Sequence, residues 1–210
     1  MIYNQTMKTY IISSAPIQYE IPPYDLYDSF DLVSKGKLKA PLLPEARKII
    51  RDFNFPFDIT SVKTILTAEG GQTFETAQLI VDVKNLQNVK IIQTPNLNGV
   101  RFNMDELVSK KELMENYEET IIRARKMFVT KFFNNELLES RESVIKRMAE
   151  SLFQLQGYNN AICISHSFYM KLLEIYISNQ EKFDNLDDLL AAFNPDNKPY
   201  ELMQGFWINL

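Results

Sequence analysis

Short apolar runs of strand length alternate with long helical patterns along this sequence. Four runs rich in β-branched residues each end in a polar residue and lead into a turn, at 9–13, 62–66, 89–93 and 161–165. The spacing of apolar residues predicts helices over 44–53, 73–83, 168–177 and 186–193, and a closing strand over 202–209. This alternation predicts an α/β protein with three layers, αβα, around a mostly parallel central sheet.

The segment 104–156 has no strand signal, but its apolar residues recur at helical spacing. Phe128 and Phe132 are followed by Val144 and three further apolar residues in the same pattern. We therefore expect a helical insertion here, within a single domain that spans residues 1–210. Its aromatic stripe is expected to lie in the core, although the length of the segment leaves room for a lid or a partner groove.

Composition and charge exclude several classes of protein. With 210 residues, 45% of them hydrophobic, the chain can form a sizeable core and is too apolar to be disordered. Its formal net charge of -4 argues against an extended nucleic-acid surface, while a local basic pocket stays compatible with it. No segment approaches the roughly 20 apolar residues of a membrane span, and residues 1–10 lack signal-peptide features. We expect a soluble protein that binds neither nucleic acid nor membrane.

The chain has one cysteine and one histidine, and both counts limit its chemistry. Cys163 cannot form an internal disulfide, and its apolar neighbours predict a buried reduced thiol, as expected of a cytoplasmic protein. Because His166 is alone, zinc sites built on two or three histidines and two-histidine mechanisms are excluded. We expect no metal and no cofactor.

Ligands of an open parallel α/β sheet bind beyond the carboxyl ends of its strands. The residues expected there include Ser13, Ser14, the pair Gly70-Gly71, and His166. The glycine pair precedes a helix and is more typical of a plain turn than of an anion site. His166 is as consistent with a group that faces the crevice as with a structural histidine. A serine nucleophile with His166 as base is conceivable, although the sequence lacks the G-x-S-x-G pattern of a nucleophile elbow.

Five short motifs follow one another along the chain. They are Ile-Ile-Ser-Ser-Ala at 11–15, Thr-Ala-Glu-Gly-Gly-Gln at 67–72 leading to Thr76-Ala77, Leu-Asn-Gly-Val at 97–100, Glu139-Ser140 with Arg147, and Ser165-His166. In this order and spacing the sequence resembles the histidine phosphatase superfamily over residues 8–177. The resemblance implies that superfamily's phosphoglycerate-mutase-like fold.

The resemblance also implies a role for each site position. Members of the superfamily form a phosphohistidine on the histidine of the first motif. They hold the phosphoryl group with two arginines and a second histidine, and an acid protonates the leaving group. In this sequence the first arginine falls on Ser13, the nucleophile on Ser14, the second arginine on Gln72, the acid on Gly99 or Asn98, and the second histidine on His166. Of these groups, only the second histidine is present.

The missing residue types carry definite chemistry. A serine hydroxyl without an adjacent base is a weak substitute for a basic imidazole nitrogen. The loss of two arginine contacts removes about 3–6 kcal/mol of phosphate binding. The chain has no other histidine that could replace the nucleophile.

The sequence therefore predicts a degenerate histidine phosphatase, a pseudoenzyme that acts as a binding, scaffold or regulatory protein. Two alternatives stay open. One is a hydrolase or mutase-like enzyme with a rewired site that uses Ser13 or Ser14 with His166. The other is an ordinary active phosphatase whose missing groups come from elsewhere. The partner, a protein or a small molecule, is left open, and a homodimer is one option.

Overall fold

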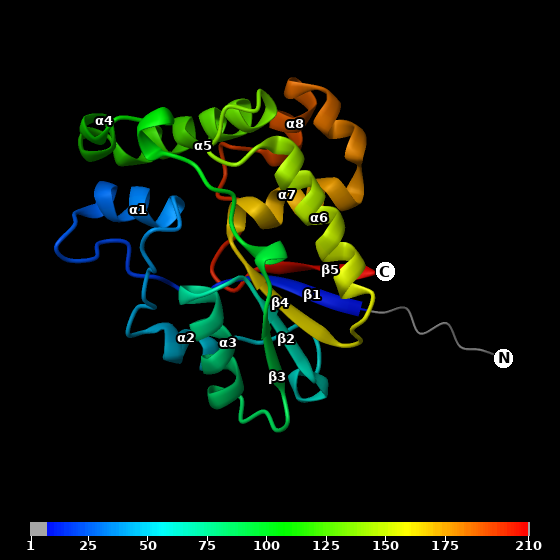
Figure 1. The fold of residues 1–210 in the computed structure, drawn as a ribbon. Coiled ribbons are helices and arrows are strands. Elements are labelled where there is room, and N and C mark those ends of the chain that lie inside the picture. Colours follow the sequence, from blue (N-terminus) through cyan, green and yellow to red (C-terminus); the bar gives the residue numbers. More distant parts are fainter. Residues whose placement is uncertain (1–7, 210) are drawn as a thin grey trace.

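A five-stranded sheet forms the centre of the computed structural model, which describes residues 8–209 (Figure 1). Its strands are β1 (Lys8–Ser13), β2 (Thr64–Thr67), β3 (Lys90–Gln93), β4 (Ala161–Ser165) and β5 (Gly205–Asn209). They lie in the order β3-β2-β4-β1-β5; the first four are parallel, and β5 pairs with β1 in the antiparallel sense. The predicted mostly parallel sheet is confirmed, and the carboxyl ends of its parallel strands share one edge.

Helices cover both faces of this sheet. They are α1 (Leu26–Ser34), α2 (Ala46–Asp52), α3 (Gly71–Val83), α4 (Lys110–Glu115), α5 (Tyr117–Phe133), α6 (Arg141–Leu155), α7 (Ser167–Ser178) and α8 (Leu186–Phe193). Figure 1 shows α2 and α3 on one face, whereas α5, α6, α7 and α8 pack on the other. This is the predicted three-layer αβα arrangement.

Consecutive strand residues belong to different cores. Ile11 and Leu66 are buried with the aromatic side chains of α5 and α7, whereas Ile12 and Ile65 are buried with Ile80 of α3. Side chains alternate across a strand, so each strand contributes to both layers. Strand β4 is apolar along most of its length because both of its faces are covered and all of its residues are buried.

The helical insertion predicted over 104–156 is divided into shorter helices. A 3₁₀ turn, η3 (Met104–Glu106), is followed by α4, α5 and α6. Ser140 caps the N-terminus of α6, because its hydroxyl accepts a hydrogen bond of 3.2 Å from the backbone N–H of Ser143 in the first turn. Phe128 and Phe132 are buried, so the aromatic stripe lies in the core as predicted.

Two differences from the predicted elements lie before β3. Helix α1 has no counterpart in the prediction; the carboxylate of Asp25 caps it by accepting a hydrogen bond of 3.0 Å from the N–H of Asp28. Strand β2 begins at Thr64 rather than at 62, because a 3₁₀ turn, η1 (Ile59–Ser61), ends just before it. The first is a missed helix and the second a shifted boundary, and both leave the order of the layers as predicted.

The closing strand β5 begins at Gly205, later than the predicted start at 202. Met203 has a φ of 62°, in the left-handed region, so an extended strand cannot run through this residue. A Cβ on Gly205 would lie 1.8 Å from the carbonyl oxygen of Ile11. Only glycine therefore permits this close approach of β5 to β1.

Candidate functional site

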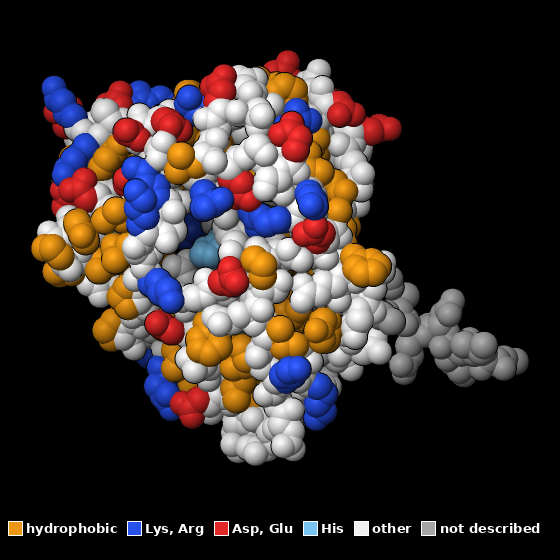
Figure 2. Space-filling model, in the orientation of Figure 1, with side chains coloured by type: hydrophobic (Ala, Val, Ile, Leu, Met, Phe, Trp, Pro, Cys, Tyr) orange, Lys and Arg blue, Asp and Glu red, His pale blue; other side chains and the backbone are white. Residues whose placement is uncertain are grey.

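A cleft of about 690 Å³ opens at the carboxyl ends of the parallel strands. Its lining comes from the strand ends, the segment between β1 and α2, the loop that follows β3, and the segment that precedes β5. Figure 2 shows His166, the one histidine of the chain, beside a hollow in the surface that Lys and Arg side chains border. A cavity of this size is typical of a small-molecule site.

All of the predicted site positions line this cleft, and four of them form one part of its wall. Strands β1 and β4 pair in register at Ser13 and Ser165, so Ser13 and Ser14 lie next to the chain segment that carries His166. Gln72 stands in the first turn of α3, directly after β2, and β2 pairs with the other side of β4. We call Ser13, Ser14, Gln72 and His166 the cleft floor.

The two serine hydroxyls of the cleft floor are not arranged as nucleophiles. Ser13 is only 6% exposed, and its Oγ donates a hydrogen bond of 2.7 Å to the carbonyl oxygen of Glu201. Ser14 is half-buried. Among residues 8–209, no hydrogen bond joins either hydroxyl to His166. A serine–histidine pair is therefore not formed in this structure.

His166 is joined to Gln72 instead. The Nε2 of Gln72 lies 3.1 Å from the Nδ1 of His166. An amide nitrogen can only donate, so in this arrangement Nδ1 accepts and the ring proton lies on Nε2. Burial, and to a smaller extent the positive charge of Arg147, lower the pKa of His166 to about 4. The imidazole is therefore neutral at pH 7.

The position expected to carry an acid lies against His166. A Cβ on Gly99 would lie 3.1 Å from the Cγ of His166, so the ring would have to shift by a few tenths of an ångström to accept a side chain there. The side chain of Asn98 turns to Glu69: its Oδ1 accepts a hydrogen bond of 2.7 Å from the N–H of Glu69, and its Nδ2 donates one of 3.1 Å to the carboxylate. Neither position supplies a carboxylic acid to the cleft floor.

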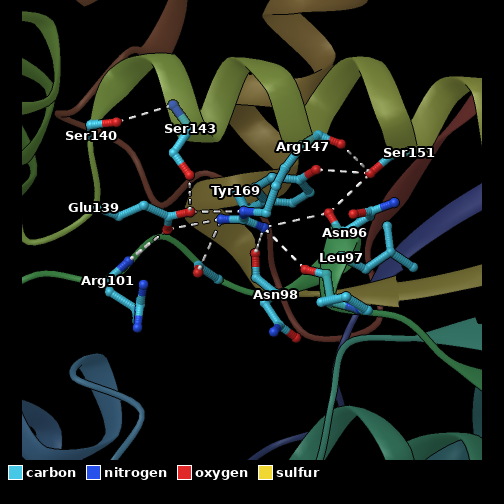
Figure 3. Close-up of polar contacts among 12 residues, drawn as sticks. Asn96, Leu97, Asn98, Arg101, Glu139, Ser140, Ser143, Arg147, Ser151 and Tyr169 are labelled. Carbon is cyan, nitrogen blue, oxygen red and sulfur yellow. Dashed lines mark hydrogen bonds and ion pairs between the residues drawn. The ribbon is translucent and has the colours of Figure 1, made fainter.

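Arg147, on α6, holds the loop after β3 in place through hydrogen bonds (Figure 3). Its Nε and Nη2 donate to the two carboxylate oxygens of Glu139 at 2.8 and 2.9 Å, and its Nη1 donates to the carbonyl oxygen of Asn98 at 2.7 Å. The guanidinium also lies 4.8 Å from the ring centroid of Tyr169. Glu139 in turn accepts a hydrogen bond from the N–H of Arg101 at 3.3 Å. We call these contacts the Arg147 cluster.

Comparison with known proteins rests on structure, because no family profile matches the sequence and no curated protein matches it significantly. The crystal structure of phosphoglycerate mutase from Bacillus anthracis has a TM-score of 0.52 at 13% identity, over 96% of this chain and 87% of that one. The α-ribazole phosphatase of Shigella flexneri has a TM-score of 0.56 at 19% identity, over 84% and 83%. YhfR of Bacillus stearothermophilus has a TM-score of 0.54 at 13% identity, over 82% and 80%.

This chain has the phosphoglycerate-mutase-like fold. The expected resemblance to the histidine phosphatase superfamily is thereby confirmed at the level of fold. Within that fold, residues of the matching motifs hold backbone segments together. Thr76 Oγ1 accepts a hydrogen bond of 3.0 Å from the N–H of Ala15, and Ser165 Oγ donates one of 2.6 Å to the carbonyl oxygen of Leu97. Both contacts position loops that line the cleft.

The glycine pair before α3 has the conformation of a turn. Gly70 and Gly71 have φ values of 76° and 49°, which other residues adopt at a cost. Lys39 packs against them: a Cβ on Gly70 would lie 2.9 Å from the Cε of Lys39. The conformation explains both glycines, as the plain-turn interpretation predicts.

Four cationic residues of the cleft are outside the sequence prediction: Lys35, Lys39, Arg101 and Lys198. They come from three loops, and loops carry no periodic signal that would place them at the strand ends. The one available signal was the lysine-rich run 35–39, which precedes α2. It could have indicated a basic wall on a phosphoglycerate-mutase-like cleft.

The described residues also bear on the expectations about metals and membranes. Among residues 8–209, no group of three or more His, Cys, Asp or Glu side chains is placed to hold a metal ion. No helix in that part of the chain is long and apolar enough to cross a bilayer. Cys163 is buried and unpaired in β4, as predicted.

Proposed function

We propose that this protein is a non-catalytic binding protein, in which the phosphoglycerate-mutase-like fold keeps its cleft without the phosphoryl-transfer reaction. The observation that carries the proposal is the neutrality of the cleft floor. Two hydroxyls, one amide and an uncharged imidazole lie where the resemblance implies a nucleophilic histidine, two arginines and a second histidine. Such a floor can bind a ligand, but it lacks the groups that would convert a phosphate ester.

Phosphoryl transfer depends on a nucleophile and on fixed positive charge around the three phosphoryl oxygens. The cleft floor provides neither. Arg147 lines the same cleft, but its guanidinium is used by Glu139 and by backbone carbonyl oxygens. Its charge is therefore committed to the loop after β3 and is not available to a ligand on the floor.

The rewired hydrolase is the alternative that the structure supports less. Its base would be His166, whose Nδ1 is taken by Gln72 and whose pKa of about 4 makes it a weak base at pH 7. Its nucleophile would be Ser13 or Ser14, and the hydroxyl of Ser13 is committed to the Glu201 carbonyl oxygen. Ser14 is the remaining candidate, so it is the residue to test.

Activity measurements on the purified protein test this proposal. We expect no hydrolysis of an aryl phosphate, an aryl ester or a panel of phosphorylated metabolites between pH 4 and 9. Turnover above about 0.01 per second, far below that of typical enzymes, would contradict the proposal if it disappears in His166→Ala. Ser14→Ala separates the alternatives: loss of such turnover in this variant would indicate the rewired hydrolase, whereas its retention would indicate a phosphatase with another nucleophile.

The scaffold or regulatory role, the cytoplasmic location and the homodimer stay predictions. A sedimentation experiment at two protein concentrations would decide between monomer and dimer.

A further inference from the structure

The cleft and the whole chain carry opposite charge. Five cationic side chains but only two carboxylates line the cleft, although the chain has a formal net charge of -4: the cations are Lys35, Lys39, Arg101, Arg147 and Lys198, and the anions are Glu69 and Glu139. Figure 2 shows Lys and Arg side chains around the hollow that contains His166. A concave surface with this charge excess attracts anions.

Two of these cations are uncompensated. Lys35 pairs with Asp31 at 2.5 Å, Lys198 pairs with Glu201 at 3.1 Å, and Arg147 belongs to its own cluster. Among residues 8–209, Lys39 and Arg101 form no ion pair. Their charges are the ones that a bound anion could neutralise.

The same cleft has an apolar wall. The rings of Tyr19 and Phe30 stack with centroids 5.8 Å apart, and the rings of Phe102 and Phe168 stack at 6.2 Å. All four residues line the cleft, and Tyr19 is 45% exposed. An exposed aromatic face beside a cavity stabilises a ligand that has an apolar or aromatic body.

We propose that the cleft binds an organic anion with an aromatic body, whose acidic group is held by Lys39 and Arg101 and whose body packs on Tyr19 and Phe30. The inference rests on the proposed function, because a non-catalytic cleft would bind such a ligand without converting it. Exposed cations contribute modestly, so the apolar body supplies most of the affinity and the charges supply selectivity. The acidic group is a carboxylate or a phosphate ester, since Lys and Arg bind both.

Calorimetry with four probes separates the two parts of such a ligand. They are 1-naphthyl phosphate, 1-naphthoate, 1-naphthol and inorganic phosphate. We expect at least one aromatic anion to bind ten times tighter than both the neutral alcohol and the bare ion. Whichever of 1-naphthyl phosphate and 1-naphthoate binds more tightly identifies the acidic group. If neither binds more tightly than both 1-naphthol and inorganic phosphate, the inference is wrong.

Matched variants test the residues. Lys39→Met and Arg101→Met should each weaken binding of the aromatic anion about fivefold, the effect of losing an exposed charge contact. Lys90→Met removes the same charge from an exposed position at the amino end of β3 and should leave binding unchanged. Equal effects of all three variants would show that only net charge matters and would overturn the site.

Tyr19→Ala tests the apolar wall. It should weaken binding of the aromatic anion and leave the affinity for inorganic phosphate unchanged. An unchanged affinity for the aromatic anion would show that Tyr19 is not part of the site. Release of 1-naphthol from 1-naphthyl phosphate would refute the non-catalytic function while leaving the anion site in place. Absence of binding would refute the anion site alone, so the two failures are distinguishable.

Discussion

The Arg147 cluster and the cleft floor face the same cleft, and they differ in charge and in the use of their side chains. Arg147 makes a bidentate ion pair with Glu139, donates to loop carbonyl oxygens, and leaves 14% of its own side chain exposed. On the cleft floor, one hydrogen bond joins Gln72 to His166, and the groups there are neutral. The cluster holds a loop in place, whereas the floor presents uncharged polar groups to the cleft.

The two groups also differ in how they relate to the motifs of the resemblance. Thr76, Ser165 and the pair Glu139–Arg147 match the motifs, and each holds a backbone segment of the cleft wall. Ser13, Ser14 and Gln72 depart from the motifs at positions where the resemblance implies chemistry. We therefore expect variants of the two groups to have different consequences.

The largest effect on stability is expected from Arg147→Met. The variant leaves the carboxylate of Glu139 buried without its partner and removes the donors to the loop after β3. Breaking a buried ion pair in this way should lower the free energy of unfolding by about 3–5 kcal/mol. Arg47→Met is the control, because its exposed pair with Asp82 should contribute less than about 1 kcal/mol. Urea denaturation that gives equal losses for both variants would contradict the role of the cluster.

An intermediate effect on stability is expected when the pH is lowered from 7 to 5. The pKa of His166 is lowered to about 4 in the folded protein, mainly by burial and also by Arg147, and is about 6.5 in an unfolded chain. Between these values the unfolded state binds more protons, so stability is highest above pH 6.5 and falls as the pH falls toward 4. His166 should account for about 1–2 kcal/mol of the loss between pH 7 and 5.

The measurement is urea denaturation of the parent and of His166→Ala at pH 7 and 5. The parent should lose more stability than the variant, because only the parent has the titrating imidazole. Equal losses would mean that the pKa of His166 is not lowered in the folded protein. Asp and Glu residues titrate in both proteins, so the comparison isolates the histidine.

The smallest effect is expected from His166→Ala at pH 7. The ring makes one side-chain hydrogen bond, to Gln72, and it lies in the wall of an open cleft. We expect a loss of less than about 1.5 kcal/mol in the free energy of unfolding. A loss above about 2.5 kcal/mol would show that the fold requires His166.

The sheet and its layers could be predicted from the sequence because they depend on periodic burial. Ile11 and Ile12 illustrate this, since adjacent residues pack into the two cores on opposite faces. The strand-end positions Ser13, Gln72 and His166 followed from the same logic, because the ends of parallel strands meet at one edge.

The charged part of the cleft could not be predicted in this way. Lys39 and Arg101 lie in loops, and the path of a loop over the sheet edge is set by tertiary contacts such as the packing of Lys39 on Gly70. The close approach of Gly99 to His166 depends on the same kind of contact. It makes the space at that position tight, which no local sequence pattern indicates.

The proposal that the cleft floor is inactive toward phosphate rests on the neutrality of its residues. The most direct test adds Ser13→Arg, Ser14→His and Gln72→Arg together and measures binding of phosphate and vanadate by calorimetry. A second variant with only the last two changes covers the case in which buried Ser13 does not tolerate arginine. Gln87→Arg with Gln180→Arg is the control, because it adds two arginines at exposed positions outside the cleft lining.

We expect the folded floor variants to bind oxyanions at least about tenfold tighter than the parent, since each added arginine provides a charge-assisted contact beside His166. The control should bind as weakly as the parent. If the floor variants fold and bind oxyanions no better than the control, Ser13, Ser14 and Gln72 do not occupy the phosphate positions of this fold, and the proposal is wrong.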